Sequence, residues 1–222
     1  MKDFSTFDIL GPIMIGPSSS HTAGAVKLGK IAMEISNGNF YKVEFYLHGS
    51  FAKTYKGHGT DKALVAGILG FEPSDDRIRN SLNIAKNKNI DIKFIEKDLG
   101  YQHPNTVKIL FKYRDKKDFY VIGSSIGGGN IVITDINGDI VEFTGDLPTM
   151  ILKYKDKKGI ISKISSILSN NELNIATMKV TRDKDIATMI CETDSKLSKN
   201  IIDEISNLSE ITYSRFMNPI RR

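Results

Sequence analysis

The chain has 222 residues, of which 40% are hydrophobic and 26% charged, which is typical of a globular protein with one large or two small domains. Its single cysteine, Cys191, excludes a disulfide framework, a zinc finger and a self-contained iron–sulfur site, because each needs several thiolates. The net charge of +5 is scattered, with 18 basic and 17 acidic side chains in residues 1–148 and 13 and 9 in residues 149–222, and no interleaved aromatic residues indicate nucleic-acid binding.

The sequence predicts no transmembrane helix, because it contains no run of about 18 apolar residues. Its first residues also lack the charged segment, long apolar stretch and small-residue cleavage site of a secretory signal. We therefore expect a cytoplasmic protein that contacts neither a membrane nor nucleic acid.

The first two thirds of the chain mix helical and strand patterns. Residues 21–36 place apolar side chains largely on one helical face, and residues 41–48 alternate apolar and polar side chains as a half-buried strand does. Two more helices are predicted at residues 60–69 and 74–88. Strands are predicted at residues 90–96, 106–113, 119–125, 130–135 and 139–143, with an Asn137-Gly138 hairpin between the last two. This pattern predicts an α+β domain with a mixed, largely antiparallel sheet.

A domain boundary is predicted at residues 144–149, where glycine and proline separate two apolar strands. It divides the chain into domains of residues 1–148 and 149–222. Strands in the second domain are predicted at residues 151–155, 175–182, 186–192 and 211–216. One helix with apolar residues at helical spacing begins at Ile160, and another is capped by Ser198. The order β-α-β-β-α-β in about 70 residues predicts a ferredoxin-like fold.

The segment GPIMIGPSSSHTAG, residues 11–24, holds the densest set of reactive side chains. Ser18, Ser19, Ser20, His21 and Thr22 lie where a loop enters the first predicted helix. A serine at that point caps free backbone N–H groups, which explains one serine but not three followed by histidine and threonine. A helix start with spare N–H groups and hydroxyls suits a carboxylate or phosphate, and His21 can move a proton near neutral pH. We therefore favour a ligand site over simple capping.

Three other polar clusters leave their interpretation open. In residues 57–63, GHGTDKA, His58 can converge on a ligand with its acidic and basic neighbours, or the segment is a glycine-rich connector. In residues 103–106, HPNT, Asn105 lies in what is by itself a plain turn. Residues 124–130 can cradle an anion with their amides, but a glycine bend between strands is the simpler interpretation.

In the second domain, the segment from Asp156 to Gly159 joins the first strand to the first helix. Such a loop at a helix start suits the charged ends of an amino acid, but from the residues alone we favour a simple cap by Asp156. Cys191 lies on an apolar strand and is predicted to be buried. The four histidines show no zinc-ligand spacing, so we predict no metal site in this chain.

Taken together, these motifs resemble the β chain of the two-chain, iron–sulfur-dependent L-serine dehydratase (L-serine ammonia-lyase) over essentially the whole sequence. The resemblance is carried, in order, by IGPSSSHTAGAVKLG at 15–29, GHGTDKALVAGILG at 57–70, HPNT at 103–106 and SIGGGNI at 125–131. The rest of residues 1–148 is similar to the allosteric substrate-binding domain of some phosphoglycerate dehydrogenases. Residues 149–222 resemble an ACT domain, an amino-acid-sensing module, although the usual Asp-x-Pro-Gly loop here reads Asp156-Lys-Lys-Gly159 without the proline.

The resemblance implies conversion of L-serine to pyruvate and ammonia. It implies a 4Fe–4S cluster, held by three cysteines of a separate α chain, with one iron open to act as a Lewis acid on the substrate hydroxyl. With one cysteine, this chain is expected to contribute no ligand to that cluster. The expected partners are therefore the α chain, L-serine and, through the ACT domain, a second copy of this chain.

The resemblance also assigns roles to residues of this chain. His21 is expected to orient the substrate or move a proton, and the hydroxyls of Ser18, Ser19, Ser20 and Thr22 to hold the substrate carboxylate. His58 and Asn105 are expected to contact the substrate as well. Asp156 and Gly159 are expected to bind an allosteric amino acid.

Two alternatives come from other classes of protein. The chain would be a stand-alone amino-acid sensor if it acted through its ACT domain without catalysis. It would be a regulatory fragment of a phosphoglycerate dehydrogenase if it belonged to that enzyme, but it lacks a G-x-G-x-x-G nucleotide-binding unit, and the serine-rich motif would then have no explanation.

Overall fold

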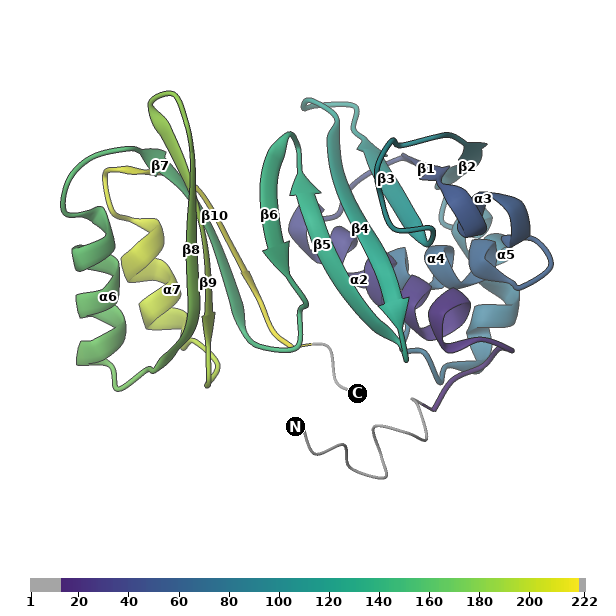
Figure 1. The fold of residues 1–222 in the computed structure, drawn as a ribbon, viewed down its shortest axis with the longest axis horizontal. Coiled ribbons are helices and arrows are strands. Elements are labelled where there is room, and N and C mark those ends of the chain that lie inside the picture. Colours follow the sequence, from purple (N-terminus) through teal and green to yellow (C-terminus); the bar gives the residue numbers. More distant parts are fainter. Residues whose placement is uncertain (1–12, 220–222) are drawn as a thin grey trace. The chain divides into compact units, whose positions relative to one another are not determined.

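The computed structural model of the protein describes residues 13–219, which fold around two β-sheets (Figure 1). Packing divides the chain into two units, one ending at Gly138 and the other beginning at Asp139. Hydrogen bonding nevertheless assigns the strand Asp139–Phe143 to the first sheet. The domain boundary after residue 148 therefore stays a prediction. Among the described residues, no helix is long and apolar enough to cross a membrane.

The first sheet has six strands in the order β2-β1-β3-β4-β5-β6. The strands are β1 (Lys42–Leu47), β2 (Asp91–Glu96), β3 (Thr106–Lys112), β4 (Phe119–Gly127), β5 (Asn130–Ile136) and β6 (Asp139–Phe143). The pair β1–β2 is parallel, whereas β3 pairs antiparallel with β1 and β4, and β4 pairs antiparallel with β5. The predicted α+β class with a largely antiparallel sheet is confirmed.

Helices cover one face of this sheet (Figure 1). They are the π-helical turn η1 (Ser19–Gly24), α2 (Ala25–Ser36), α3 (Gly49–Thr54), α4 (Thr60–Ile68), the 3₁₀ turn η2 (Asp76–Asn80) and α5 (Ser81–Asn87). The buried side of α2 packs against β3, β4 and β5, and that of α5 against β2. Alternating strand residues such as Val43, Phe45 and Leu47 are fully buried beneath the helices, as their period of two predicts.

The structure differs from the predicted helices of this unit at two places. The single helix predicted over 74–88 is interrupted, because the Asp75 carboxylate accepts the backbone N–H of Arg77 at 2.9 Å and closes a 3₁₀ turn before α5 begins at Ser81. The helix α3 was not predicted at all. With six residues it spans less than two turns, too few to show a helical period in the sequence.

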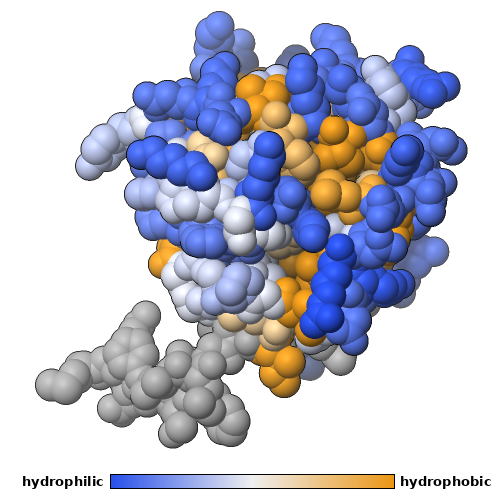
Figure 2. All heavy atoms as spheres, turned by 90° about the vertical axis from the view of Figure 1, so that its right-hand side faces the viewer, coloured by the Kyte–Doolittle hydropathy of each residue, from blue (hydrophilic) through white to orange (hydrophobic). Residues whose placement is uncertain are grey.

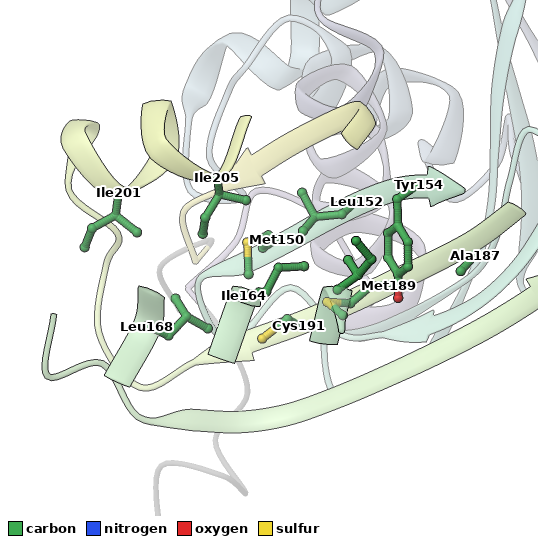
Figure 3. Packing of buried hydrophobic residues seen from close by; sticks show 11 residues of the cluster. Met150, Leu152, Tyr154, Ile164, Leu168, Ala187, Met189, Cys191, Ile201 and Ile205 are labelled. Carbon is green, nitrogen blue, oxygen red and sulfur yellow. The ribbon is translucent and has the colours of Figure 1, made fainter. Parts of the chain in front are cut away.

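The second unit contains a four-stranded antiparallel sheet in the order β10-β7-β9-β8. Its elements are β7 (Thr149–Lys155), α6 (Ile160–Asn170), β8 (Ile175–Asp183), β9 (Ile186–Thr193), α7 (Lys199–Ser206) and β10 (Ile211–Met217). Both helices lie on one face of the sheet (Figure 1). Figure 3 shows how side chains of β7 and β9, such as Leu152 and Met189, pack against Ile164 of α6 and Ile205 of α7. The predicted β-α-β-β-α-β order is confirmed.

The helices α2 and α4 approach each other through two glycines. A Cβ atom added to Gly29 would lie 2.5 Å from the carbonyl oxygen of Leu64, and one added to Gly67 would lie 2.2 Å from that of Val26. Both obstacles are backbone atoms, which cannot turn aside as a flexible side chain can. The absence of side chains at these two positions is therefore what permits the close packing of α2 on α4.

We predict that Gly67→Ala destabilises the protein by about 1–3 kcal/mol, because the added methyl group forces the helices apart. The loss arises although alanine is favoured over glycine within a helix by about 1 kcal/mol. Urea denaturation followed by far-ultraviolet circular dichroism measures the change. The matched control is Gly57→Ala, whose added carbon would lie 3.8 Å from its nearest neighbour, the carbonyl oxygen of Thr54. Equal stability of both variants would show that the two helices have room between them.

Candidate functional site

The serine-rich motif forms the turn η1, which continues directly into α2. Ser18 is the N-cap, and its Oγ accepts the backbone N–H of His21 at 3.3 Å. The predicted capping role of one serine is therefore present. The turn is wound as a π-helix, a form that is rare and is frequently found at functional sites. Ser19 and Ser20 lie within it and are half-buried, whereas His21 and Thr22 are buried.

The imidazole of His21 lies among hydroxyl groups and is only 8% exposed. Its Nδ1 atom lies 3.3 Å from Ser18 Oγ. Its Nε2 atom lies 3.1 Å from Thr54 Oγ1 and 3.4 Å from Ser50 Oγ, both on α3. The ring of Phe51, also on α3, packs against it with centroids 5.2 Å apart. The side chain of His21 is thus held from both ends and along one side.

His58 also reaches this site from the turn between α3 and α4. Its ring meets that of His21 edge to face, with centroids 4.8 Å apart. Burial, together with the charge that His58 can carry, lowers the pKa of His21 below the ordinary value for histidine. At neutral pH the imidazole of His21 is therefore uncharged and able to accept a proton.

Asn105, which was predicted to contact the substrate, lies near the serine-rich turn η1 through Ser125 rather than against His21. Its backbone exchanges contacts with Ser125 of β4, whose N–H donates to the Asn105 carbonyl at 3.0 Å, and its side-chain Nδ2 donates to the Ser125 carbonyl at 3.4 Å. Ser125 in turn lies against Gly24 of η1, where an added Cβ atom would lie 2.1 Å from Ser125 Oγ. The loop before β3 and the end of β4 thus flank the C-terminal end of η1.

Two buried hydroxyls at η1 have no hydrogen-bond partner within the described part of the chain. They belong to Thr22, on the turn itself, and to Ser125, against Gly24. Leaving a buried hydroxyl unpaired costs about 1–3 kcal/mol. Such groups are expected where a ligand or a second chain supplies the missing partner.

Sequence reasoning missed Ser50, Phe51 and Thr54, the three residues of α3 that contact His21. The signal available was weak, namely two hydroxyl residues four positions apart after His48-Gly49. That spacing puts both hydroxyls on one face of a helix, but the helix itself was not predicted. The backbone N–H of Ser50 donates to the carbonyl of Pro104 at 2.8 Å, so the HPNT segment helps to place α3.

The side chain of Asp156 does not cap the helix α6. The N-cap of α6 is Gly159, which has a φ of 91° and makes no side-chain cap, and Asp156 pairs with Arg182 Nε at 3.0 Å. Capping by Asp156 is therefore wrong. A φ in the left-handed region is readily adopted by glycine, which accounts for Gly159 without a ligand.

The described residues offer no ligand set for a metal cluster. No group of three or more His, Cys, Asp or Glu side chains within residues 13–219 is arranged to hold a metal ion. Cys191 is buried in the core of the second unit, where burial raises the pKa of its thiol to about 11 (Figure 3). A thiol that resists ionisation is a poor ligand for iron.

We predict that His21 makes folding stability depend on pH. Because its folded pKa is lowered, the unfolded chain binds a proton first as the pH falls below about 6.5. The stability associated with neutral His21 is therefore complete above that value and is lost as the pH falls through the lowered pKa. Urea denaturation between about pH 8 and pH 5 should show a larger loss for the wild type than for His21→Gln. Equal losses would show that burial does not perturb this imidazole.

Known proteins match the chain over nearly its full length. The serine dehydratase beta chain family matches residues 5–86, and the ACT domain family matches residues 149–210. The L-serine dehydratase beta chain of Peptoniphilus asaccharolyticus is 47% identical over 98% of this chain and 99% of its own length. The probable L-serine dehydratase beta chain of Bacillus subtilis is 42% identical over 95% and 96%.

A D-3-phosphoglycerate dehydrogenase of Bacillus subtilis is 30% identical over 84% of this chain, but the match covers only 36% of that enzyme. The similarity to dehydratase β chains is thus both stronger and more complete, as the serine-rich motif and the HPNT segment predicted. The chain belongs to the family of L-serine dehydratase β chains.

Proposed function

We propose that this chain is the β subunit of a two-chain L-serine dehydratase, which with an α chain converts L-serine to pyruvate and ammonia. The observation that carries the proposal is the buried, neutral imidazole of His21 held beside the serine-rich turn. Such a group suits proton transfer at neutral pH. The two dehydratase β chains that match along nearly their whole length support L-serine as the substrate.

The reaction removes the α proton and the hydroxyl group of serine, and the resulting aminoacrylate is hydrolysed to pyruvate and ammonia. We assign the substrate carboxylate to the start of η1, where Ser18, Ser19 and Ser20 offer hydroxyls and backbone N–H groups. The unpartnered hydroxyl of Thr22 supports this assignment. His21 moves a proton at its ring.

His58 and Asn105 have secondary roles in this proposal. His58 meets the ring of His21 directly, which supports a place for it at the substrate. Asn105 lies beside Ser125 at the other end of η1, and its amide would reach the substrate only through that end of the turn.

A 4Fe–4S cluster does not fit the residues described in this chain. We therefore propose that an α chain holds the cluster. When bound, the cluster would supply a Lewis acid for the substrate hydroxyl. The β chain then contributes the binding of the carboxylate, the proton chemistry of His21 and the secondary contacts of His58 and Asn105.

Exposed apolar side chains in the first unit support a partner chain. Ile13 is 87% exposed and Ile126 is 50% exposed, and Tyr101 is fully exposed. Ile126 directly follows Ser125, and Tyr101 lies two residues before His103, so both belong to segments that flank η1. On the side of α3 and α5, Figure 2 shows hydrophobic patches between hydrophilic residues. Apolar patches of this kind are typical of surfaces that bind other proteins.

Reconstitution with an α chain tests the proposed function. We expect the isolated β chain to form no pyruvate from L-serine and the anaerobically assembled pair to form it. His21→Ala should lower kcat by about 10²–10⁴-fold while the visible absorbance of the cluster persists. Ser19→Ala should weaken serine binding by about 1–3 kcal/mol. The control is Ser162→Ala, which removes an exposed hydroxyl on α6 and should leave both constants unchanged.

Two results would contradict the proposal. Pyruvate formation by the isolated chain would refute the two-chain arrangement. Wild-type kinetics in both the His21 and the Ser19 variants would leave the serine-rich turn with no role beyond capping α2.

We further propose that the ACT domain joins two β chains. The strands β8 and β10 lie at the two edges of its sheet, where a strand of another copy can add, and both helices lie on the same face. An amino acid bound at Asp156 and Gly159 would bias that association, if it displaced the Asp156–Arg182 pair.

We predict that the full β chain sediments as a dimer and that a chain truncated after residue 148 sediments as a monomer. The reason is that truncation removes the sheet whose edges would pair. Analytical ultracentrifugation at several concentrations measures both masses. Circular dichroism of the truncated chain provides the control for folding. A monomeric full chain would refute self-association through the ACT domain.

A further inference from the structure

The hydroxyl of Thr54 lies between a backbone carbonyl and a ring nitrogen of His21. Its Oγ1 lies 2.8 Å from the backbone carbonyl of Ser50, one turn earlier in α3, and 3.1 Å from His21 Nε2. A carbonyl oxygen only accepts, so the single hydroxyl proton of Thr54 is donated to Ser50. Thr54 can then meet the imidazole only as an acceptor, which requires a hydrogen on Nε2.

The other ring nitrogen has the complementary arrangement. In a neutral imidazole with its hydrogen on Nε2, Nδ1 carries a lone pair. Ser18 Oγ lies 3.3 Å from Nδ1 and accepts the backbone N–H of His21 with its own lone pair, so its hydroxyl proton remains available for Nδ1. The chain Ser18–His21–Thr54–Ser50 carbonyl is thus satisfied with the hydrogen of the ring on Nε2.

The remaining neighbours of the ring do not reverse this direction. Ser50 Oγ lies 3.4 Å from Nε2, farther away than Thr54 Oγ1 at 3.1 Å, so the shorter Thr54 contact sets the direction and Ser50 can accept from the same N–H group. Phe51 and His58 meet the ring through their own rings. A buried imidazole beside another histidine is also held neutral, which keeps a single hydrogen on the ring.

We propose that Thr54 is a positioning residue that fixes His21 as the tautomer with hydrogen on Nε2, so that its basic atom is Nδ1 on the Ser18 side. If the proposed function holds, a proton taken up by His21 enters at Nδ1, next to the serine-rich turn, while the Nε2–H group continues to donate to Thr54 Oγ1. The direction of the Thr54 hydrogen bond thereby decides which ring nitrogen accepts the proton.

Nitrogen magnetic resonance of the full chain, labelled with ¹⁵N-histidine, tests this directly at about pH 8, above the ordinary histidine pKa of about 6.5. We expect the wild type to show a bare, pyridine-type Nδ1 and a protonated, pyrrole-type Nε2, with the Nε2–H proton itself visible because it is buried and hydrogen-bonded. The His21→Gln spectrum assigns the signals. A pyrrole-type Nδ1 in the wild type would overturn the proposal without any variant.

Thr54→Val keeps the shape of the side chain but removes the acceptor. We expect the Nε2–H signal of His21 to be lost to exchange with water and the two nitrogen shifts to move toward an average of both tautomers. Thr54→Ser retains the hydroxyl and should restore the wild-type pattern. His103 is an internal control, because its Nδ1 accepts the backbone N–H of Asn105 at 3.1 Å, independently of Thr54. An unchanged His21 spectrum in Thr54→Val would refute the role of Thr54.

The two proposals fail separately. If His21→Ala in the assembled enzyme retained full turnover, His21 would have no part in the reaction, yet the tautomer measured in the isolated chain would stand. Conversely, a wrong tautomer in the spectrum would leave the two-chain assignment intact and would only exchange the two ring nitrogens in its chemistry.

Discussion

The site around His21 depends on how closely backbone can approach backbone at the start of α2. Gly24 lies against Ser125 of β4, and Gly29 and Gly67 bring α2 onto α4 at a distance that leaves no room for a Cβ atom. Interiors are packed too densely for a methyl group to be absorbed at such a contact. These contacts place η1 between β4 and α4, and the turn before α4 places His58 against the imidazole of His21.

The position of η1 also determines the charge of the His21 imidazole. Its close partners are hydroxyls of Ser18, Ser50 and Thr54 and the rings of Phe51 and His58. A carboxylate in the same place would favour the charged imidazolium and raise the pKa. Hydroxyls satisfy both nitrogens without adding charge, so burial dominates and the ring stays neutral. The site is therefore suited to accept a proton and not to hold a positive charge.

The second unit is organised on different principles. Its core is a single layer of apolar side chains between one sheet and two helices (Figure 3), and its one cysteine is part of that layer. The polar loop that follows β7 is held by the Asp156–Arg182 pair and by a glycine whose φ of 91° begins α6. Arg182 of β8 is exposed and Asp156 of the loop is half-exposed, and ion pairs of this kind contribute little to stability, so a ligand could displace this one at small cost.

The sequence by itself determined the elements that have a period long enough to read. The alternation in residues 41–48, the helical spacing after Ile160 and the Asn137-Gly138 turn are local patterns, and the structure forms a strand, a helix and a hairpin there. The sequence also marked Ser18 and His21 as chemically unusual, because three serines before a histidine exceed what a helix cap requires, whereas it left the role of His58 open. It did not reveal the six-residue helix α3, which is too short to show a period. It therefore missed Ser50 and Thr54, whose hydroxyls contact His21. Only the tertiary structure joins residues about 30 positions apart around one ring, because that meeting depends on the packing of η1 on β4 and α4 and of α3 on β2 and β3, which no local pattern encodes.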